Sequence, residues 1–109
     1  MLLTTRGAAL KDLARLAEAE QSAISAITLT PNGFYPYNLL GAIRYQSGQP
    51  EEAITYFQKA KELGAPEREQ DKFIISALRR AGDGERRRVG EYLAVRDSET
   101  FRKFSQFFE

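Results

Sequence analysis

Segment 37–63 constrains the fold most, because small and large residues stand in it at fixed helical offsets. The small residues Gly41 and Ala53 lie among bulky ones such as Phe57, and Gly48 separates two helical patterns. Small side chains at a helix crossing let the two backbones approach closely, and glycine is the usual residue just past a helix end. The segment therefore predicts one antiparallel helix pair with a close crossing.

The same pattern recurs along the chain at a period of 34 residues. The recurring pairs are Ala19 and Ala53, Ala26 and Ala60, Leu29 and Leu63, Leu40 and Ile74, and Gly48 and Gly82. Segment 18–32 then corresponds to the second helix of a preceding pair, and segment 67–84 to the first helix of a following pair. In that following pair, Ile75 stands where the repeat has Gly41 and Arg87 where it has Ala53. Larger residues push helices apart, so we expect this pair to cross more loosely.

These residues resemble a tetratricopeptide repeat, whose pattern is W-x2-L-G-x2-Y, then A-x3-F, then P. The matching positions are Tyr37 in place of the tryptophan, Leu40, Gly41, Ala53 and Phe57, with Arg44 in place of the second aromatic residue and a late proline at Pro66. We identify one repeat at about 34–67, flanked by degenerate repeats. The resemblance implies an all-α fold: an antiparallel helix array, a tetratricopeptide-like α-solenoid of about two to three repeat units, with a C-terminal capping helix. We expect residues 1–109 to form a single helical repeat domain.

Turn residues place the helices. We expect helices at about 6–29, 36–47, 50–63, 67–80 and 85–96, and a last helix capped by Asp97 or Ser98. Repeat spacing would divide segment 6–29 near Ala14 to Ala17, but no helix breaker occurs there, which favours one long helix and leaves two helices as the alternative. The apolar stripe expected on that segment is Leu10, Leu13, Ala17, Ile24 and Ile27.

The composition excludes several kinds of catalytic and metal-binding site. The chain has no cysteine and no histidine, so it lacks a thiol nucleophile, the commonest general base and the commonest metal ligand. Carboxylates are plentiful, but none lies on a predicted apolar face, and no phosphate-binding glycine loop is present. We expect no enzyme activity, no catalytic residues, no cofactor and no metal. No apolar run approaches the ~18 residues of a membrane span, and the N-terminal segment lacks the features of a secretory signal, so we expect no membrane association and a cytoplasmic protein.

In the family that the repeat resembles, the first helices of successive repeats line a concave groove that binds peptides or partner helices. The exposed inner face of the helix at 36–47 would carry Asn38, Ala42 and Tyr45, and the 34-residue shift adds Lys72, Ser76 and Arg79. We predict a peptide-binding groove at Asn38, Tyr45, Lys72, Ser76 and Arg79, with an acidic segment or a C-terminal carboxylate as partner. The alternative is a polar surface without a binding role. The carboxylate-binding specialisation of the chaperone-binding members is not assigned, because its first-repeat residues have no counterpart here.

Two other clusters have two interpretations each. The basic residues Arg86 to Arg88 could meet nucleic acid, but a net charge of +1 and the lack of interleaved aromatic residues favour a solvated helix face. The aromatic residues of the last helix predict either a cap over the final repeat or an oligomer surface, such as that of a homodimer. They are Phe101, Phe104, Phe107 and Phe108.

The sequence thus predicts a protein–protein interaction module or adaptor. The alternatives are a homo-oligomeric scaffold domain, and a nucleic-acid accessory domain that uses the Arg86–Arg88 cluster. Nucleic acid is the less favoured partner.

Overall fold

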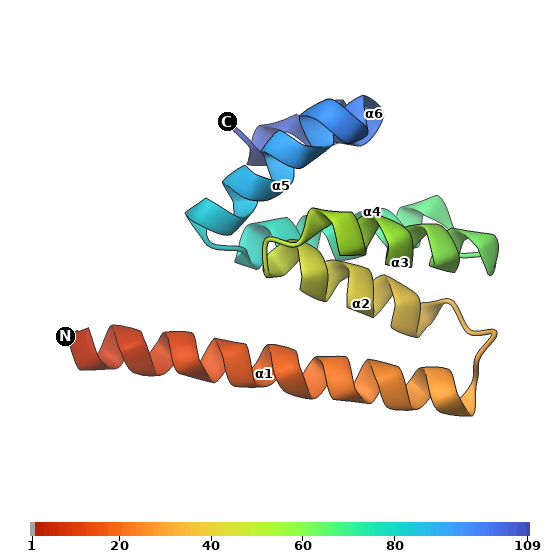
Figure 1. The fold of residues 1–109 in the computed structure, drawn as a ribbon, viewed down its shortest axis with the longest axis horizontal. Helices are drawn as coiled ribbons and strands as arrows, with labels where there is room; N and C mark the ends of the chain where they lie inside the picture. The colour runs from red at the N-terminus through yellow and green to blue at the C-terminus, as the bar shows by residue number, and fades with distance from the viewer. Residues whose placement is uncertain (1) are drawn as a thin grey trace.

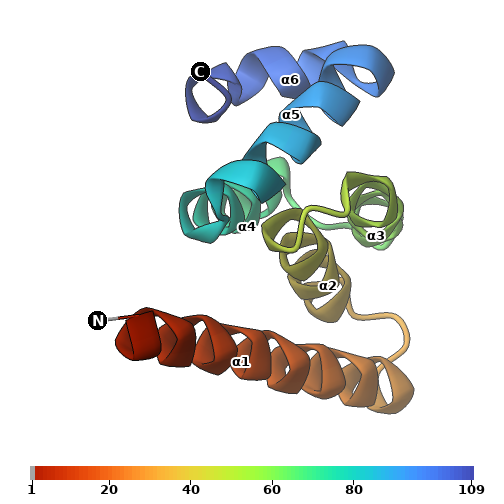
Figure 2. The same cartoon turned by 60° about the vertical axis from the view of Figure 1, so that its left-hand side comes forward.

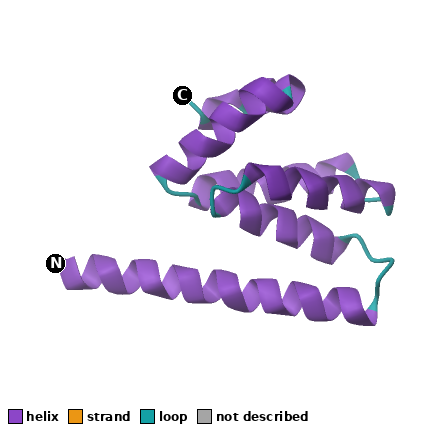
Figure 3. Cartoon of the chain, in the orientation of Figure 1, coloured by secondary structure: helices purple, strands orange, loops and turns teal. Residues whose placement is uncertain are grey.

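The computed structural model describes the backbone of residues 2–109 and the side chains of residues 15–109 (Figure 1). Its elements are α1 (Leu2–Leu29), α2 (Tyr35–Gln46), α3 (Pro50–Glu62), α4 (Glu67–Arg80), α5 (Asp83–Arg96), α6 (Ser98–Lys103) and a 3-10 turn, η1 (Ser105–Phe107). Residues 2–109 contain no strand, which confirms the all-α prediction (Figure 3). No helix in this range is both long and apolar enough to cross a bilayer.

Helix α1 is continuous, so the one-helix alternative is confirmed. It contacts α2 through Ala23, which is buried. The predicted apolar stripe is wrong at Ala17 and Ile24, which are exposed, Ile24 by 46%; the side chains of Leu10 and Leu13 lie outside the described residues. The stripe was wrong because α2 covers only one side of α1, and within residues 2–109 α2 is the one helix that packs closely on α1.

Arg44 joins three helices at this contact. Its guanidinium pairs with Glu20 of α1, its Nε lies 2.8 Å from Glu52 Oε2 of α3, and its Nη1 donates to Gln49 Oε1 at 3.2 Å. The position where the repeat pattern has an aromatic residue therefore provides an ionic link between α1, α2 and α3.

Helices α2 and α3 form the close pair that the sequence predicts. A Cβ atom at Gly41 would lie 2.7 Å from ring atoms of Phe57, and Ala53 is fully buried. Gly48 has φ +73° and ends α2, and the next amide, of Gln49, donates to Arg44 O at 2.8 Å. The positive φ explains the glycine there, since other residues adopt it at a cost.

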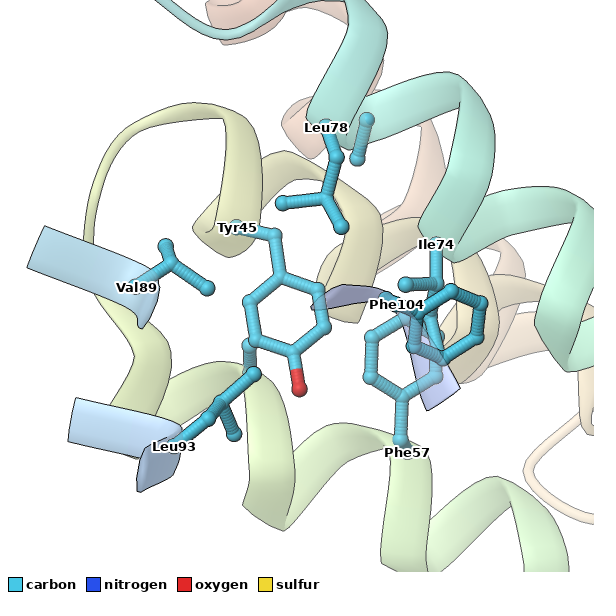
Figure 4. Packing of buried hydrophobic residues seen from close by; sticks show 9 residues of the cluster. Tyr45, Phe57, Ile74, Leu78, Val89, Leu93 and Phe104 are labelled. Atoms are coloured by element: carbon cyan, nitrogen blue, oxygen red, sulfur yellow. The ribbon is translucent and has the colours of Figure 1, made fainter. Parts of the chain in front are cut away.

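Helix α4 lies beside α2, whereas α5 turns away from α4 and packs against α2, α3 and α6 (Figures 1 and 2). The looser crossing predicted from Ile75 and Arg87 is confirmed, because α4 and α5 make little close contact. The core fills the space between these helices. Its large members, drawn in Figure 4, are Tyr45, Phe57, Ile74, Leu78, Val89, Leu93 and Phe104.

The C-terminal segment covers this core. Asp97 caps α6, as predicted, by accepting from Thr100 N at 3.2 Å and from Thr100 Oγ1 at 2.6 Å. The prediction that Phe107 and Phe108 lie on this helix is wrong, because α6 ends at Lys103 and η1 follows. Phe104, the C-cap residue of α6, is buried, and its ring enters the core.

Phe108 then packs within the chain. Its ring stacks on Phe101 with centroids 5.4 Å apart, and a Cβ atom at Gly90 would lie 2.9 Å from it. Gly90, which weakens α5 by helix propensity, makes room for this ring. The contacts favour the capping interpretation of the four phenylalanines.

Lys103 joins the cap to α4 through an ion-pair cluster. Its Nζ lies 2.9 Å from both Glu67 Oε1 and Asp71 Oδ1. The hydrogen bond from Lys103 lowers the pKa of Glu67, and the bond to Glu67 raises the pKa of Lys103.

We expect these pKa shifts to make the cap pH-dependent. A carboxylate with a lowered pKa stabilises the fold above its ordinary pKa, and this contribution is lost as the pH falls through the lowered pKa. Lys103→Met should therefore lower the thermal midpoint at pH 7 by a small amount, because the pair is exposed. The difference from wild type should be smaller at about pH 3, which lies below the ordinary pKa of a glutamate side chain. Thermal melts of both proteins at the two pH values test this; a difference that is unchanged at low pH would rule out the ion-pair contribution.

Candidate functional site

A groove of about 600 Å³ lies between α1, α2 and α4. In Figure 2, α2 lies above α1 and beside α4. The lining residues are Arg15, Leu16 and Ala19 from α1; Leu39, Ala42, Ile43 and Gln46 from α2; and Phe73, Ser76, Ala77 and Arg80 from α4.

The walls from α2 and α4 repeat the 34-residue period. Each α4 residue in the groove follows an α2 residue by 34 positions: Phe73 follows Leu39, Ser76 follows Ala42, Ala77 follows Ile43 and Arg80 follows Gln46. Two successive first helices therefore present the same register to the groove, as the stacking of repeats requires.

The floor of the groove is apolar and reachable by solvent. Leu16, Leu39 and Phe73 are each half-buried, and Ala42 between them is too. Apolar side chains that stay partly exposed along one hollow are the usual lining of a binding groove.

Positive charge surrounds this floor. Arg15 stands on the α1 wall and Arg80 on the α4 wall. Arg80 also borders a second hollow of about 410 Å³, which is lined by the α4 residues Lys72, Ile75, Ser76 and Arg79. No carboxylate lines either hollow within the part of the chain whose side chains are described.

The comparison with known proteins gives a match over the central helix pair. Residues 34–64, which hold α2 and α3, match the family model described as Tetratricopeptide repeat. This segment is therefore similar to a tetratricopeptide repeat. No curated protein and no solved structure gave a significant match. The match confirms the repeat predicted at about 34–67.

The structure brings three of the five predicted groove residues together. Lys72, Ser76 and Arg79 are exposed on one face of α4 and line the second hollow. The predicted exposure of the other two is wrong: Asn38 is 0% exposed and Tyr45 is 2% exposed.

Both buried residues, Asn38 and Tyr45, contact other helices. Asn38 Oδ1 accepts from Gln70 Nε2 of α4 at 3.2 Å, and the same nitrogen donates to Phe57 O at 2.7 Å. Tyr45 lies against Phe57, Val89 and Leu93 (Figure 4). Burial, followed by the nearby charge of Asp97, raises the pKa of the Tyr45 hydroxyl above its ordinary value.

Sequence reasoning missed Arg80, Phe73 and the α1 wall. Arg80 and Phe73 could have been found by the 34-residue shift from Gln46 and Leu39. Leu16 carried no such signal, because its place in the groove depends on which side of α1 packs beside α2, and the 34-residue shift does not indicate this.

The Arg86–Arg88 cluster has a structural contact that its sequence did not predict. Arg86 Nε donates to Leu78 O at 2.9 Å and its Nη2 donates to Ala81 O at 2.8 Å. These carbonyls lie at the end of α4, where backbone acceptors lack helical partners. Arg86 thus caps α4 and is not available as part of a continuous basic surface.

Proposed function

We propose that this chain is a non-catalytic interaction module that holds a segment of a partner protein in the α1/α2/α4 groove. The observation that carries the proposal is the apolar floor, which three helices build and leave open to solvent. Tetratricopeptide repeats generally mediate protein–protein interactions, and this supports a protein partner. The same proposal holds that residues 1–109 form a single helical domain, that this domain uses no cofactor and that it works in the cytoplasm.

Self-association stays a second prediction. The four aromatic residues of the cap are less available for it than their sequence suggests, because Phe104 is 4% exposed and Phe101 stacks on Phe108. A homodimer at this surface would rest on the exposed parts of Phe101, Phe107 and Phe108. Sedimentation velocity of wild type and Phe107→Ser tests this interface. A wild-type dimer that the substitution dissociates would support it, and a dimer that the substitution leaves intact would exclude it.

A substitution on the groove floor tests the proposed function. Ala42→Arg should place a long charged side chain across the apolar floor and remove partner binding, while the helix remains intact because arginine has good helix propensity. We expect proteins captured from native extract by the immobilised wild type to be lost with Ala42→Arg, as identified by mass spectrometry.

Ala94→Arg is the matched control. Ala94 is exposed on α5, outside the groove, so the same substitution there should keep every captured protein. Circular dichroism establishes that both variants fold. Equal capture by Ala42→Arg and wild type would place the binding surface elsewhere.

A further inference from the structure

We infer that the segment bound in the groove is an amphipathic α-helix that carries carboxylates on both sides of its apolar stripe. This inference rests on the proposed function and names the kind of partner. It follows from two features of the groove: the shape and polarity of its floor, and the charges on its walls.

The floor favours a helix over an extended chain. A segment buried on apolar residues such as Leu39 and Phe73 must satisfy its own backbone hydrogen bonds, which a helix does internally. An extended peptide gains affinity by pairing with an open sheet edge, and residues 2–109 form no sheet. Among the described residues that line the groove, Gln46 is the sole amide side chain that could pair with the backbone of an extended peptide.

Small residues leave space for the bound helix. Ala19, Ala42, Ser76 and Ala77 come from three helices and line the groove together. Small side chains permit helix axes to approach to about 8–10 Å, the distance at which a fourth helix packs on its neighbours. The larger residues Leu16, Leu39 and Phe73 then lie where the apolar stripe of that helix would meet them.

The walls select the charge of the partner. Arg15 and Arg80 stand on opposite walls, and Lys72 and Arg79 extend the positive surface along α4. Lys72 has one ion pair among the described residues, to Glu69 at 3.8 Å, with its side chain 69% exposed, and such pairs hold weakly. Because the whole chain has a net charge of +1, this is a local concentration of cations. Carboxylates on a bound helix would meet them at both edges.

The same surface fits nucleic acid less well. Single-stranded nucleic acid is held by bases stacking on open aromatic faces. Phe73 is the one aromatic side chain among the lining residues that the structure describes, and its ring already packs edge-on against Tyr35, with centroids 5.5 Å apart. A phosphate backbone would also cover apolar floor residues without any favourable contact to them.

Fluorescence anisotropy with designed peptides tests the inference. The acidic probe is a labelled peptide of about 18 residues, or five helical turns, with leucines on one face and glutamates elsewhere. A second probe has lysine for each glutamate, and a third has the acidic composition reordered so that the leucines share no face. We expect the acidic probe to bind, more weakly as salt rises, and both other probes to bind about tenfold more weakly or not at all.

Charge reversal on the protein completes the test. Arg79→Glu combined with Arg80→Glu should weaken the acidic probe by about tenfold. The control combines Lys59→Glu with Arg102→Glu, which changes the net charge equally. All four residues lie in the last turn of a helix, so the loss of helix-dipole stabilisation is matched. The control should bind like wild type.

Three results would overturn the inference: equal binding of the lysine probe or the reordered probe, equal weakening by the control, or tighter binding of a labelled DNA duplex than of the acidic probe. These outcomes differ from failure of the proposed function. If Ala42→Arg loses its captured proteins but the acidic probe does not bind, the groove binds proteins of another chemistry. If Ala42→Arg keeps those proteins, the groove itself is excluded.

Discussion

Replacing Gly41 with leucine should destabilise the fold by about 3 kcal/mol, near the upper end of the usual cost of overpacking. Even a Cβ atom at this position would lie 2.7 Å from the Phe57 ring. Phe57 is itself buried in the core, so its ring would have to shift against its core neighbours. For a domain of this size, each kcal/mol lowers the thermal midpoint by about 4–8 °C, so a thermal melt shows the effect clearly.

Gly84→Ala is the control for this substitution. A Cβ atom at Gly84 has no neighbour within 4 Å, and the residue lies inside α5. Alanine there should leave stability unchanged or raise it by about 0.5–1 kcal/mol through helix propensity. A Gly41→Leu protein as stable as the parent would show that α2 and α3 do not cross at this residue.

Phe104→Ala should cost about 3–5 kcal/mol, the usual price of removing a buried phenylalanine ring. Its ring enters the cluster formed by Tyr45, Phe57 and Ile74 (Figure 4), although α6 itself has only six residues. A small domain is stable by about 5–15 kcal/mol, so this single change should remove a large fraction of the total. Urea denaturation followed by circular dichroism measures it.

Phe107→Ala provides the comparison, because Phe107 is half-buried at the edge of the same cluster. We expect it to cost less than half as much as Phe104→Ala. Equal effects at the two positions would contradict the structure of the cap, in which Phe104 fills the core and Phe107 covers its edge.

The repeat was predictable because its determinants are local. Gly41, Phe57 and Ala53 belong to two helices joined by a short turn, so fixed spacing in the sequence corresponds to fixed contacts in space. Pro50 and Gly48 mark the turn by their own backbone preferences, and the structure uses both as expected.

Tyr45 was not predictable from the same spacing. Tyr45 is buried because α5 turns away from α4 and packs Val89 and Leu93 against the end of α2. The sequence indicates that the last pair is loose but contains no local signal for where a loose helix then packs. The turn after Lys103 has the same origin, since it follows from the insertion of Phe104 into a distant core.

The groove was predictable in part. Lys72, Ser76 and Arg79 share a face of α4 because helical spacing and the 34-residue shift place them there. The apolar floor was not foreseen, because Leu16 and Leu39 line one groove only where α1 packs beside α2, and no local sequence pattern indicates which side of α1 does so.

The most direct test of the account is to map where the acidic helical probe binds, by amide chemical shifts of the isotope-labelled protein. We predict that the largest shift changes fall on the groove residues Ala19, Ala42, Ser76 and Arg80, from all three helices that form the site. Amides of α3 and α6 should change little. Changes concentrated on α3 or α6, with the groove amides unaffected, would contradict the claim that this groove is the interaction surface.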